Sequence, residues 1–317
     1  MPSAPGRPEP AATRPAGHPA AHPAAPTVAA VGATGLWAVG NLMAGAAVLP
    51  GPQLAFWRVL CGAAVYQAVF HLRGGRMTAA TFRTAALGGV AFGGSAALFF
   101  TALQTTTVAS ATVIAALQPV FLLPYAVRRM GEKVDGARLA LIGLAVVGTV
   151  LVVAGSSSSG EWSPWGDLLA VAGTLVGCAY FVGTKRARQT LDTLEYQAAA
   201  LPIGALVALA GALMTGPGLV RPSPSDLAWA ALMMAIPGTG HLLMSWAQKD
   251  LDVTTTATIA LDVVVLSSLG AVVFFGESLG ALQLLGMAVV LVALALYVRR
   301  AGRAATDPAE VAVVPGE

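Results

Sequence analysis

Long apolar stretches alternate with short polar segments along almost the whole chain. Each stretch is close to the ~20 residues that a helix needs to cross a hydrocarbon core of about 30 Å. Backbone groups in lipid must satisfy their own hydrogen bonds, so we predict a helix for each stretch; the alternating pattern of β-barrel strands is missing. The ten predicted spans are 28–48, 54–71, 84–103, 107–127, 139–155, 166–184, 196–215, 227–247, 254–275 and 281–298.

The composition supports a membrane protein of the all-α polytopic class. Of the 317 residues, 56% are hydrophobic and 10% are charged, whereas a soluble domain has about 25% charged residues. The net charge of +3 does not indicate nucleic-acid binding, because the basic residues lie in short clusters between apolar stretches. Cys61 and Cys178 lie inside apolar stretches and match no disulfide or metal-site spacing. We therefore expect no metal, no cofactor and no nucleic-acid partner.

The loops and termini predict the orientation. Residues 1–27 are rich in proline and alanine and lack the apolar core of a signal peptide, and residues 301–317 have a similar composition. We expect two disordered tails. If both tails are cytoplasmic, all 18 Lys and Arg residues except Arg58 and Arg221 lie on the cytoplasmic side. The high alanine and glycine content is typical of a GC-rich bacterial genome, so we expect a multi-pass protein of the bacterial inner membrane. We expect the monomer as the favoured state.

An internal repeat divides the chain into two halves. A shift of 145 residues superimposes Gly131-Glu132 on Gly276-Glu277 and Ile114-Ala115 on Ile259-Ala260. We predict five-helix units at 28–155 and 156–300. Because five spans per unit is an odd number, the second unit is inverted relative to the first, an arrangement common in secondary transporters.

Several short motifs point to a known family. Trp37 and Gly40-Asn41 occur in span one, and Phe56-Trp57-Arg58 leads into span two. Gln118-Pro119 and Gly131-Glu132 follow in span four, and Gly276-Glu277 follows span nine. In these motifs and their order the chain resembles the drug/metabolite transporter superfamily, in particular its EamA-type ten-helix members. The resemblance implies efflux of amino acids, other metabolites or drugs, driven by an ion gradient or by the solute gradient itself.

This chain also departs from the family pattern. Members often have a proline in span nine, where the 145-residue shift gives Val264, and Asp262 is an unusual residue at that place. A carboxylate within a span costs about 2.5–3.5 kcal/mol on insertion scales unless it is paired, hydrated or protonated. We expect Asp262 to face the central cavity, either as a proton carrier or as the partner of a substrate ammonium group, or else to be a structural hydrogen-bonding group.

Other polar and aromatic residues within spans are candidate substrate-binding residues. Arg58 has the fork geometry for a carboxylate, although it is also able to reach the interface. His241 is a candidate proton relay, and the preceding Pro237 predicts a break in span eight. Proline also interrupts span four beside Gln118. The remaining candidates are Trp37 and Asn41, which share one face of span one, Tyr180, Phe99 and Trp246.

These features favour a secondary transporter that exports a small metabolite, with an amino acid as the leading substrate. Movement of lipid-linked groups or of drugs is an alternative. A receptor without transport, or a membrane enzyme, is less favoured, because the chain has no metal-site or phosphate-loop motif and a receptor does not need an inverted repeat. We also expect Glu132 and Glu277 to cap the helices that follow them or to pair with basic residues, and Gly89 and Gly93 to allow close helix packing.

Overall fold

The computed structural model describes residues 24–45, 49–156, 162–214, 219, 221–276 and 278–306, and this part of the chain contains helices and no strand. Glu277 and most residues of the two predicted tails lie outside it. The helices are α1 (Ala25–Gly45), α2 (Gly51–Leu72), α3 (Ala79–Thr105), α4 (Val108–Ala116), α5 (Gln118–Met130), α6 (Gly136–Gly155), α7 (Pro164–Ala187), α8 (Thr193–Met214), α9 (Pro224–Ala247), α10 (Val253–Ile259), α11 (Asp262–Phe275) and α12 (Ala281–Thr306).

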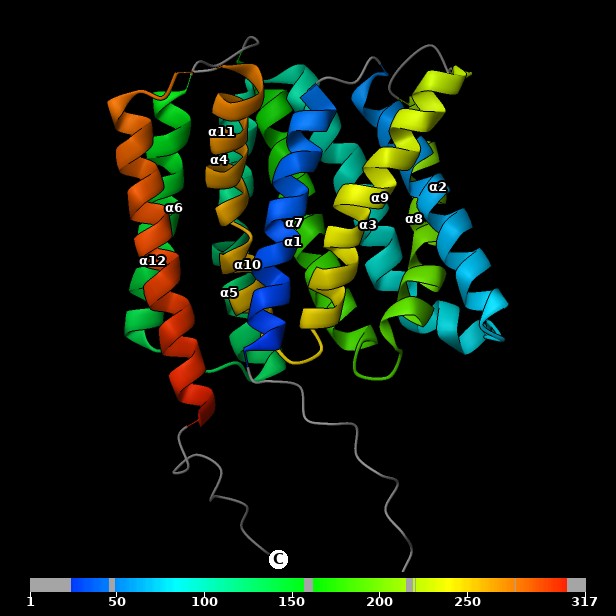
Figure 1. Ribbon diagram of the computed structural model, residues 1–317. Coiled ribbons are helices and arrows are strands. Elements are labelled where there is room, and N and C mark those ends of the chain that lie inside the picture. The colour runs from blue at the N-terminus through cyan, green and yellow to red at the C-terminus, as the bar shows by residue number, and fades with distance from the viewer. Residues whose placement is uncertain are drawn as a thin grey trace, which may run out of the picture.

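The predicted membrane architecture is confirmed. Within the described residues, nine helical spans are long and apolar enough to cross a membrane; α4–α5 and α10–α11 each form one of them. α1, with 21 residues, is the tenth span and packs against α9 and α11. In Figure 1, α1 starts at the lower face and α7, the first helix of the second half, starts at the upper face, so the two five-helix halves are inverted.

Polar side chains mark the helix ends. Thr78, Asp135 and Asp252 each accept a hydrogen bond from a backbone N–H in the first turn of the helix that follows. α5 and α11 both end at a glycine in the left-handed conformation, Gly131 (φ 70°) and Gly276 (φ 68°). The repeat is therefore visible in the backbone as well as in the sequence.

Helices from opposite halves pack in pairs, with α3 against α7, α1 against α9, α2 against α8, and α6 against α12. Glycine permits the closest approaches. A Cβ atom on Gly183 of α7 would lie 2.6 Å from the backbone nitrogen of Gly88 on α3, and one on Gly89 would lie 2.6 Å from the Ala200 carbonyl of α8. The prediction that small residues such as Gly89 allow close packing is confirmed.

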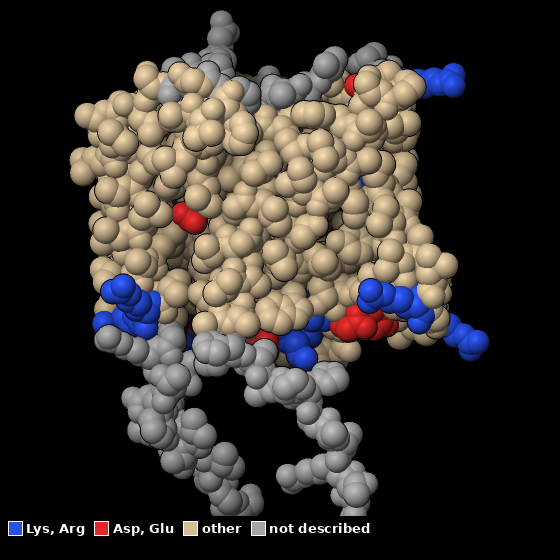
Figure 2. Space-filling view, in the orientation of Figure 1, with Lys and Arg blue, Asp and Glu red and all other residues tan. Residues whose placement is uncertain are grey.

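The face at which α1 begins and α12 ends, here called the terminal face, holds most of the charge. Figure 2 shows Lys and Arg side chains along this lower edge and, above it, a broad band of other residues in which acidic atoms are visible at one place. Arg138 of α6 donates to Asp252 (2.9 Å), Thr255 (3.0 Å) and Tyr297 (2.8 Å) at this face. The ion pair thus joins the first half of the chain to α10 of the second half.

Glu132 also joins the two halves, in a way that the sequence did not predict. We expected it to cap the helix that follows it or to pair with basic residues, but Asp135 caps α6. The two carboxylate oxygens of Glu132 instead accept from the backbone N–H groups of Val253 (2.6 Å) and Thr254 (3.2 Å), the first residues of α10. The free N–H groups at a helix start attract a carboxylate regardless of which segment supplies it.

Candidate functional site

A cavity lies between the two halves of the bundle. Its walls are α2 and α3 from the first half and α8 and α9 from the second, and about 350 Å³ of empty space lies within it and its mouth. The lining residues are Arg58, Val59, Gly62, Tyr66, Phe92, Gln197, Leu201, Met233, Met234, Gly238 and His241. The lining is mainly apolar with a few polar groups, which is typical of a small-molecule site.

Arg58 is the charged group of this cavity. It lies in the second turn of α2, which starts after Pro50, and its guanidinium faces the space between the halves. The lining contains no carboxylate. Within the described residues, Arg58 belongs to neither of the ion pairs and its guanidinium has no hydrogen-bond acceptor. A cation without a partner in a low-dielectric setting is a strong attractor for an anionic group.

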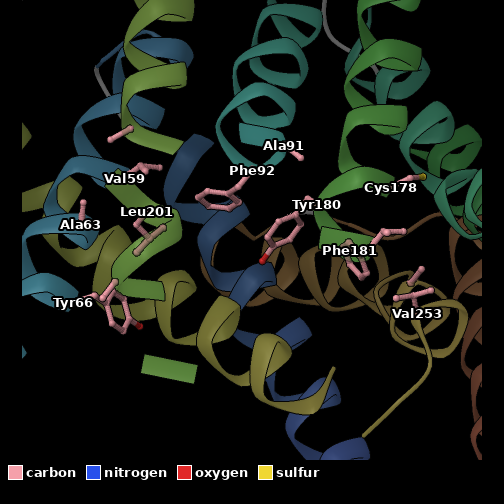
Figure 3. Packing of buried hydrophobic residues seen from close by; sticks show 14 of the residues in the cluster. Val59, Ala63, Tyr66, Ala91, Phe92, Cys178, Tyr180, Phe181, Leu201 and Val253 are labelled. Carbon is pink, nitrogen blue, oxygen red and sulfur yellow. The ribbon is translucent and has the colours of Figure 1, made fainter. Parts of the chain in front are cut away.

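His241 stands at the centre of an aromatic cluster beside Arg58. A hydrogen bond of 3.3 Å joins its Nδ1 to the Tyr180 hydroxyl. Its ring centroid lies 4.8 Å from that of Trp37 and 4.9 Å from that of Phe92. Figure 3 shows the rings of Phe92 and Tyr180 side by side, 5.3 Å apart. Three predicted residues, Trp37, Tyr180 and His241, are therefore brought together against the cavity.

Sequence reasoning missed Tyr66, Phe92 and Gln197. Gln197 is 4% exposed, Tyr66 is 9% exposed, and neither side chain has a hydrogen-bond partner among the described residues. A signal for Tyr66 was present, because Arg58, Gly62 and Tyr66 recur every four residues and so share one helix face. Gln197 gave no such signal, since it reaches the cavity only because α8 packs on α2.

Asp262 does not line this cavity. It is the first residue of α11, and its carboxyl lies beside the Thr34 hydroxyl of α1. Two turns beyond Thr34 on the same seam, Asn41 Nδ2 donates to Ser267 Oγ of α11 (3.2 Å). The structure therefore places the predicted residues Asp262 and Asn41 on the α1–α11 seam, and Arg58 and His241 in the cavity.

Gln118 occupies the equivalent place in the first half. It is the first residue of α5, and its backbone carbonyl accepts from the Cys178 thiol of α7 at 3.6 Å. Its Nε2 is buried and has no partner among the described residues. The remaining two candidates lie elsewhere, Phe99 in a small apolar cluster with Ala102 and Trp246 on the surface, 36% exposed.

The prediction of a break at Pro237 was wrong. α9 is continuous from Pro224 to Ala247, and Pro237 packs against Gly40 of α1, where a Cβ would lie 2.7 Å from the proline Cβ. The second interrupted helix is α10–α11, which breaks at Ala260 and Leu261. There the N–H of Leu261 donates to Thr258 and that of Val263 to Ala260, a tighter 3₁₀ pattern without proline.

Two inverted five-helix halves, interrupted spans and a cavity between the halves are features that recur in transporters. The model of the EamA-like transporter family matches residues 26–154 and 164–299. The chain therefore belongs to this family and is a membrane transporter.

Two further comparisons found similar proteins, one by sequence and one by fold. An uncharacterized transporter of Archaeoglobus fulgidus is 27% identical over 201 residues, which cover 62% of this chain and 68% of the relative. A protein chain known from a crystal structure has the same fold, with a TM-score of 0.73 and 23% identity, over 89% of this chain and 99% of the other.

Proposed function

We propose that this transporter moves a small solute that carries a carboxylate, with an amino acid as the leading candidate, and that the carboxylate binds Arg58. The observation that supports the proposal is the guanidinium without a partner in a cavity that has no acid in its lining. An arginine fork is able to bind a carboxylate through two parallel hydrogen bonds. A substrate carboxylate would satisfy Arg58, and the amides and hydroxyls around it would complete the site.

The other lining residues suggest how the rest of an amino acid is held. Gln197 and the Tyr66 hydroxyl offer hydrogen bonds, since neither has a partner among the described residues. The Phe92 ring and the Tyr66 ring offer π faces for an ammonium group. The ammonium would rest on these faces, because Asp262 lies on a different seam. Because the cavity is confined between four packed helices, we propose a small solute and not a lipid-linked group or a large drug.

The transport cycle that we propose is alternating access. The cavity lies between helices of both halves, so a rocking motion of one half against the other would expose it to each side in turn. We propose export across the bacterial inner membrane by a monomer. The terminal face would be cytoplasmic, because Lys and Arg gather there (Figure 2).

Counterflow in proteoliposomes tests the proposal. Purified protein is reconstituted and loaded in turn with each of a panel of amino acids, and uptake of the same labelled compound is measured with and without a pH gradient. Arg58→Gln should raise the concentration for half-maximal counterflow about 10- to 100-fold, the value of one charge-assisted pair. Arg58→Lys should recover part of that loss.

Arg221→Gln serves as the control, because Arg221 is exposed ahead of α9 and outside the cavity. Its counterflow should match the wild type. Wild-type counterflow in Arg58→Gln would remove the assignment of the carboxylate site, and equal uptake of decarboxylated amines would point to a cationic solute instead.

A further inference from the structure

We propose that Asp262 forms a proton-binding site on the α1–α11 seam, separate from the substrate cavity, and that α1 transmits its protonation state to the cavity. The coupling part of this inference rests on the proposed transport function. The proton site itself rests on the local geometry and is testable without any substrate.

The carboxyl of Asp262 is buried and incompletely bonded. The residue is 8% exposed, and its Oδ1 atom is buried with no hydrogen-bond partner among the described residues. It follows the break at Ala260 and Leu261, so it lies within the Val253–Phe274 span and not at its end. An ionised carboxylate in this setting needs a cation or several donors, and protonation is the alternative.

Among the described side chains, no cation forms an ion pair or a hydrogen bond with Asp262. Described residues of α1, α10 and the rest of α11 include no charged side chain. Asp252 lies ten residues earlier, about 15 Å away along a helix, and is paired with Arg138. The cations described on the neighbouring helices lie toward the terminal face: Arg138 on α6, Arg128 and Arg129 on α5, Arg299 and Arg300 on α12, and Lys185 on α7, which donates to the Leu251 carbonyl. Tyr297 of α12 bonds Arg138 there, whereas Asp167 of α7 lies at the opposite face and accepts from Thr106 and Ser110.

Thr34 gives the site two distinct states. Its hydroxyl donates to the Val31 carbonyl at 2.6 Å, while the same oxygen lies beside the Asp262 carboxyl. A threonine has one hydroxyl proton. With that proton on Val31, the Thr34 oxygen is free to accept, and a protonated Asp262 would supply the proton between the two side chains.

Loss of the proton from Asp262 would change this arrangement. The carboxylate then has no proton to donate, so the Thr34 hydroxyl would turn from the Val31 carbonyl to the carboxylate. One proton leaves Asp262, and one hydrogen bond moves from the α1 backbone to the α1–α11 seam. The change therefore alters how α1 is held against α11.

α1 connects this seam to the cavity. One turn beyond Thr34, Trp37 contacts His241, with ring centroids 4.8 Å apart. One further turn along, Gly40 lies against Pro237 of α9. A shift of α1 at Thr34 would thus be felt at His241, which lines the cavity.

Carbodiimide labelling tests the proton site directly. Dicyclohexylcarbodiimide enters membranes and modifies protonated carboxyl groups, so the full-length protein in liposomes is treated over a range of pH and the modified peptides are quantified by mass spectrometry. We expect modification at Asp262 that falls as the pH rises, and a fall at lower pH in Thr34→Ser than in Thr34→Val, because serine retains the hydroxyl that stabilises the carboxylate. Absence of labelling at every pH, or labelling independent of pH and of Thr34, would overturn the proposal.

Transport separates this site from the cavity. With a radiolabelled amino-acid mixture as the probe, Asp262→Asn should retain counterflow within about twofold of the wild type but lose accumulation driven by a pH gradient. Loss of counterflow in folded Asp262→Asn protein would place Asp262 in the substrate site, and unchanged gradient-driven accumulation would remove its proton role. If Asp262→Asn does not fold, Thr34→Val, which keeps the carboxyl, replaces it. We expect this variant too to retain counterflow and to lose accumulation driven by a pH gradient. Wild-type protein without counterflow would reject the amino-acid proposal, and the labelling result would still decide the proton site.

Discussion

The interrupted helices α4–α5 and α10–α11 have the same backbone plan but differ in chemistry. Each has a short first segment, a break, and a second segment that ends at a left-handed glycine. Gln118 begins α5 and lies against α7, whereas Asp262 begins α11 and lies against α1. The two halves thus place a neutral amide and an ionisable acid at equivalent seams.

The first turns of α10 and α4 are also held by different contacts. α10 is held by charges, namely the Glu132 carboxylate and the pair of Arg138 with Asp252. At the start of α4 the hydroxyls of Thr106 and Ser110 donate to the Asp167 carboxylate of α7, at 2.8 and 2.6 Å, and no ion pair among the described residues supports it. The comparison teaches that a repeat is able to keep its backbone while one copy acquires an ionisable side chain at its break.

The largest effect is expected where charges hold α10. Arg138→Met removes the partner of Asp252 and the donor to Thr255 and Tyr297, and should lower the free energy of unfolding by about 3 kcal/mol, since the Arg138 side chain is 9% exposed. Denaturation in detergent, followed by circular dichroism, measures the change. Arg300→Met is the matched control, because the Arg300–Asp135 pair is exposed, and its curve should be unchanged.

A second test makes the two seams alike. Gln118→Glu places an acid against α7, where none of the described hydroxyls donates to the Gln118 side chain as Thr34 would to Asp262. We expect a loss of about 2 kcal/mol in stability near neutral pH, because the carboxylate is buried without donors. Gln118→Leu is the control and should be neutral or stabilising, since it removes an Nε2 that has no partner. Equal thermal stability of the two variants would contradict the expected difference between the seams.

The start of α4 should be less sensitive than the start of α10. Asp167→Asn weakens the bonds from Thr106 and Ser110 and faces an amide toward Trp162, and should cost about 1 kcal/mol. The melting temperature in detergent measures it beside Arg138→Met. A larger drop in melting temperature for Asp167→Asn than for Arg138→Met would contradict the expectation that the start of α4 is less sensitive than the start of α10.

The smallest effect is a pH dependence at Glu132. Burial raises the pKa of this carboxyl, against the hydrogen bonds from Thr254 and Val253. Its contribution to stability is therefore full below the ordinary glutamate value of about 4.3 and is lost as the pH rises through the raised value. The difference in unfolding free energy between wild type and Glu132→Gln should shrink over that rise.

Asp135→Asn gives the opposite sign. Its pKa is lowered, first by the Arg138 backbone N–H and then by Arg300, so its contribution is present above the ordinary aspartate value and is lost as the pH falls. Measuring the unfolding free energy of both variants as a function of pH distinguishes the contributions of these two loop carboxyls from that of Asp262. If the stability difference from wild type changed with pH in the same direction for both variants, the opposite signs expected for Glu132 and Asp135 would be contradicted.

The sequence was sufficient for the spans, the repeat and the family, because lipid imposes apolar length on every crossing segment. It also identified Arg58, Tyr180 and His241, since polar groups within apolar stretches are conspicuous. It did not place Asp262 apart from Arg58, because that separation depends on how α11 packs against α1.

Proline was an unreliable guide to the broken helix. Pro119 marks the α4–α5 break, but Pro237 lies inside continuous α9, where Gly40 makes room for its ring. The α10–α11 break has no proline, and repeat symmetry was the better signal for it. Gln197 and Phe92 entered the site through contacts between helices far apart in the sequence, which no local pattern reports.

The depth of the α10–α11 break has an electrical consequence. Asp262 lies near the middle of the Val253–Phe274 span, so a proton that reaches it from either side crosses roughly half of the membrane field, worth about 1 kcal/mol per 100 mV. At the proton site proposed for Asp262, voltage would therefore change the occupancy of the carboxyl even when the pH is equal on the two sides. An interior-negative potential would draw protons from outside toward Asp262, so the two components of the proton-motive force would add at a single residue.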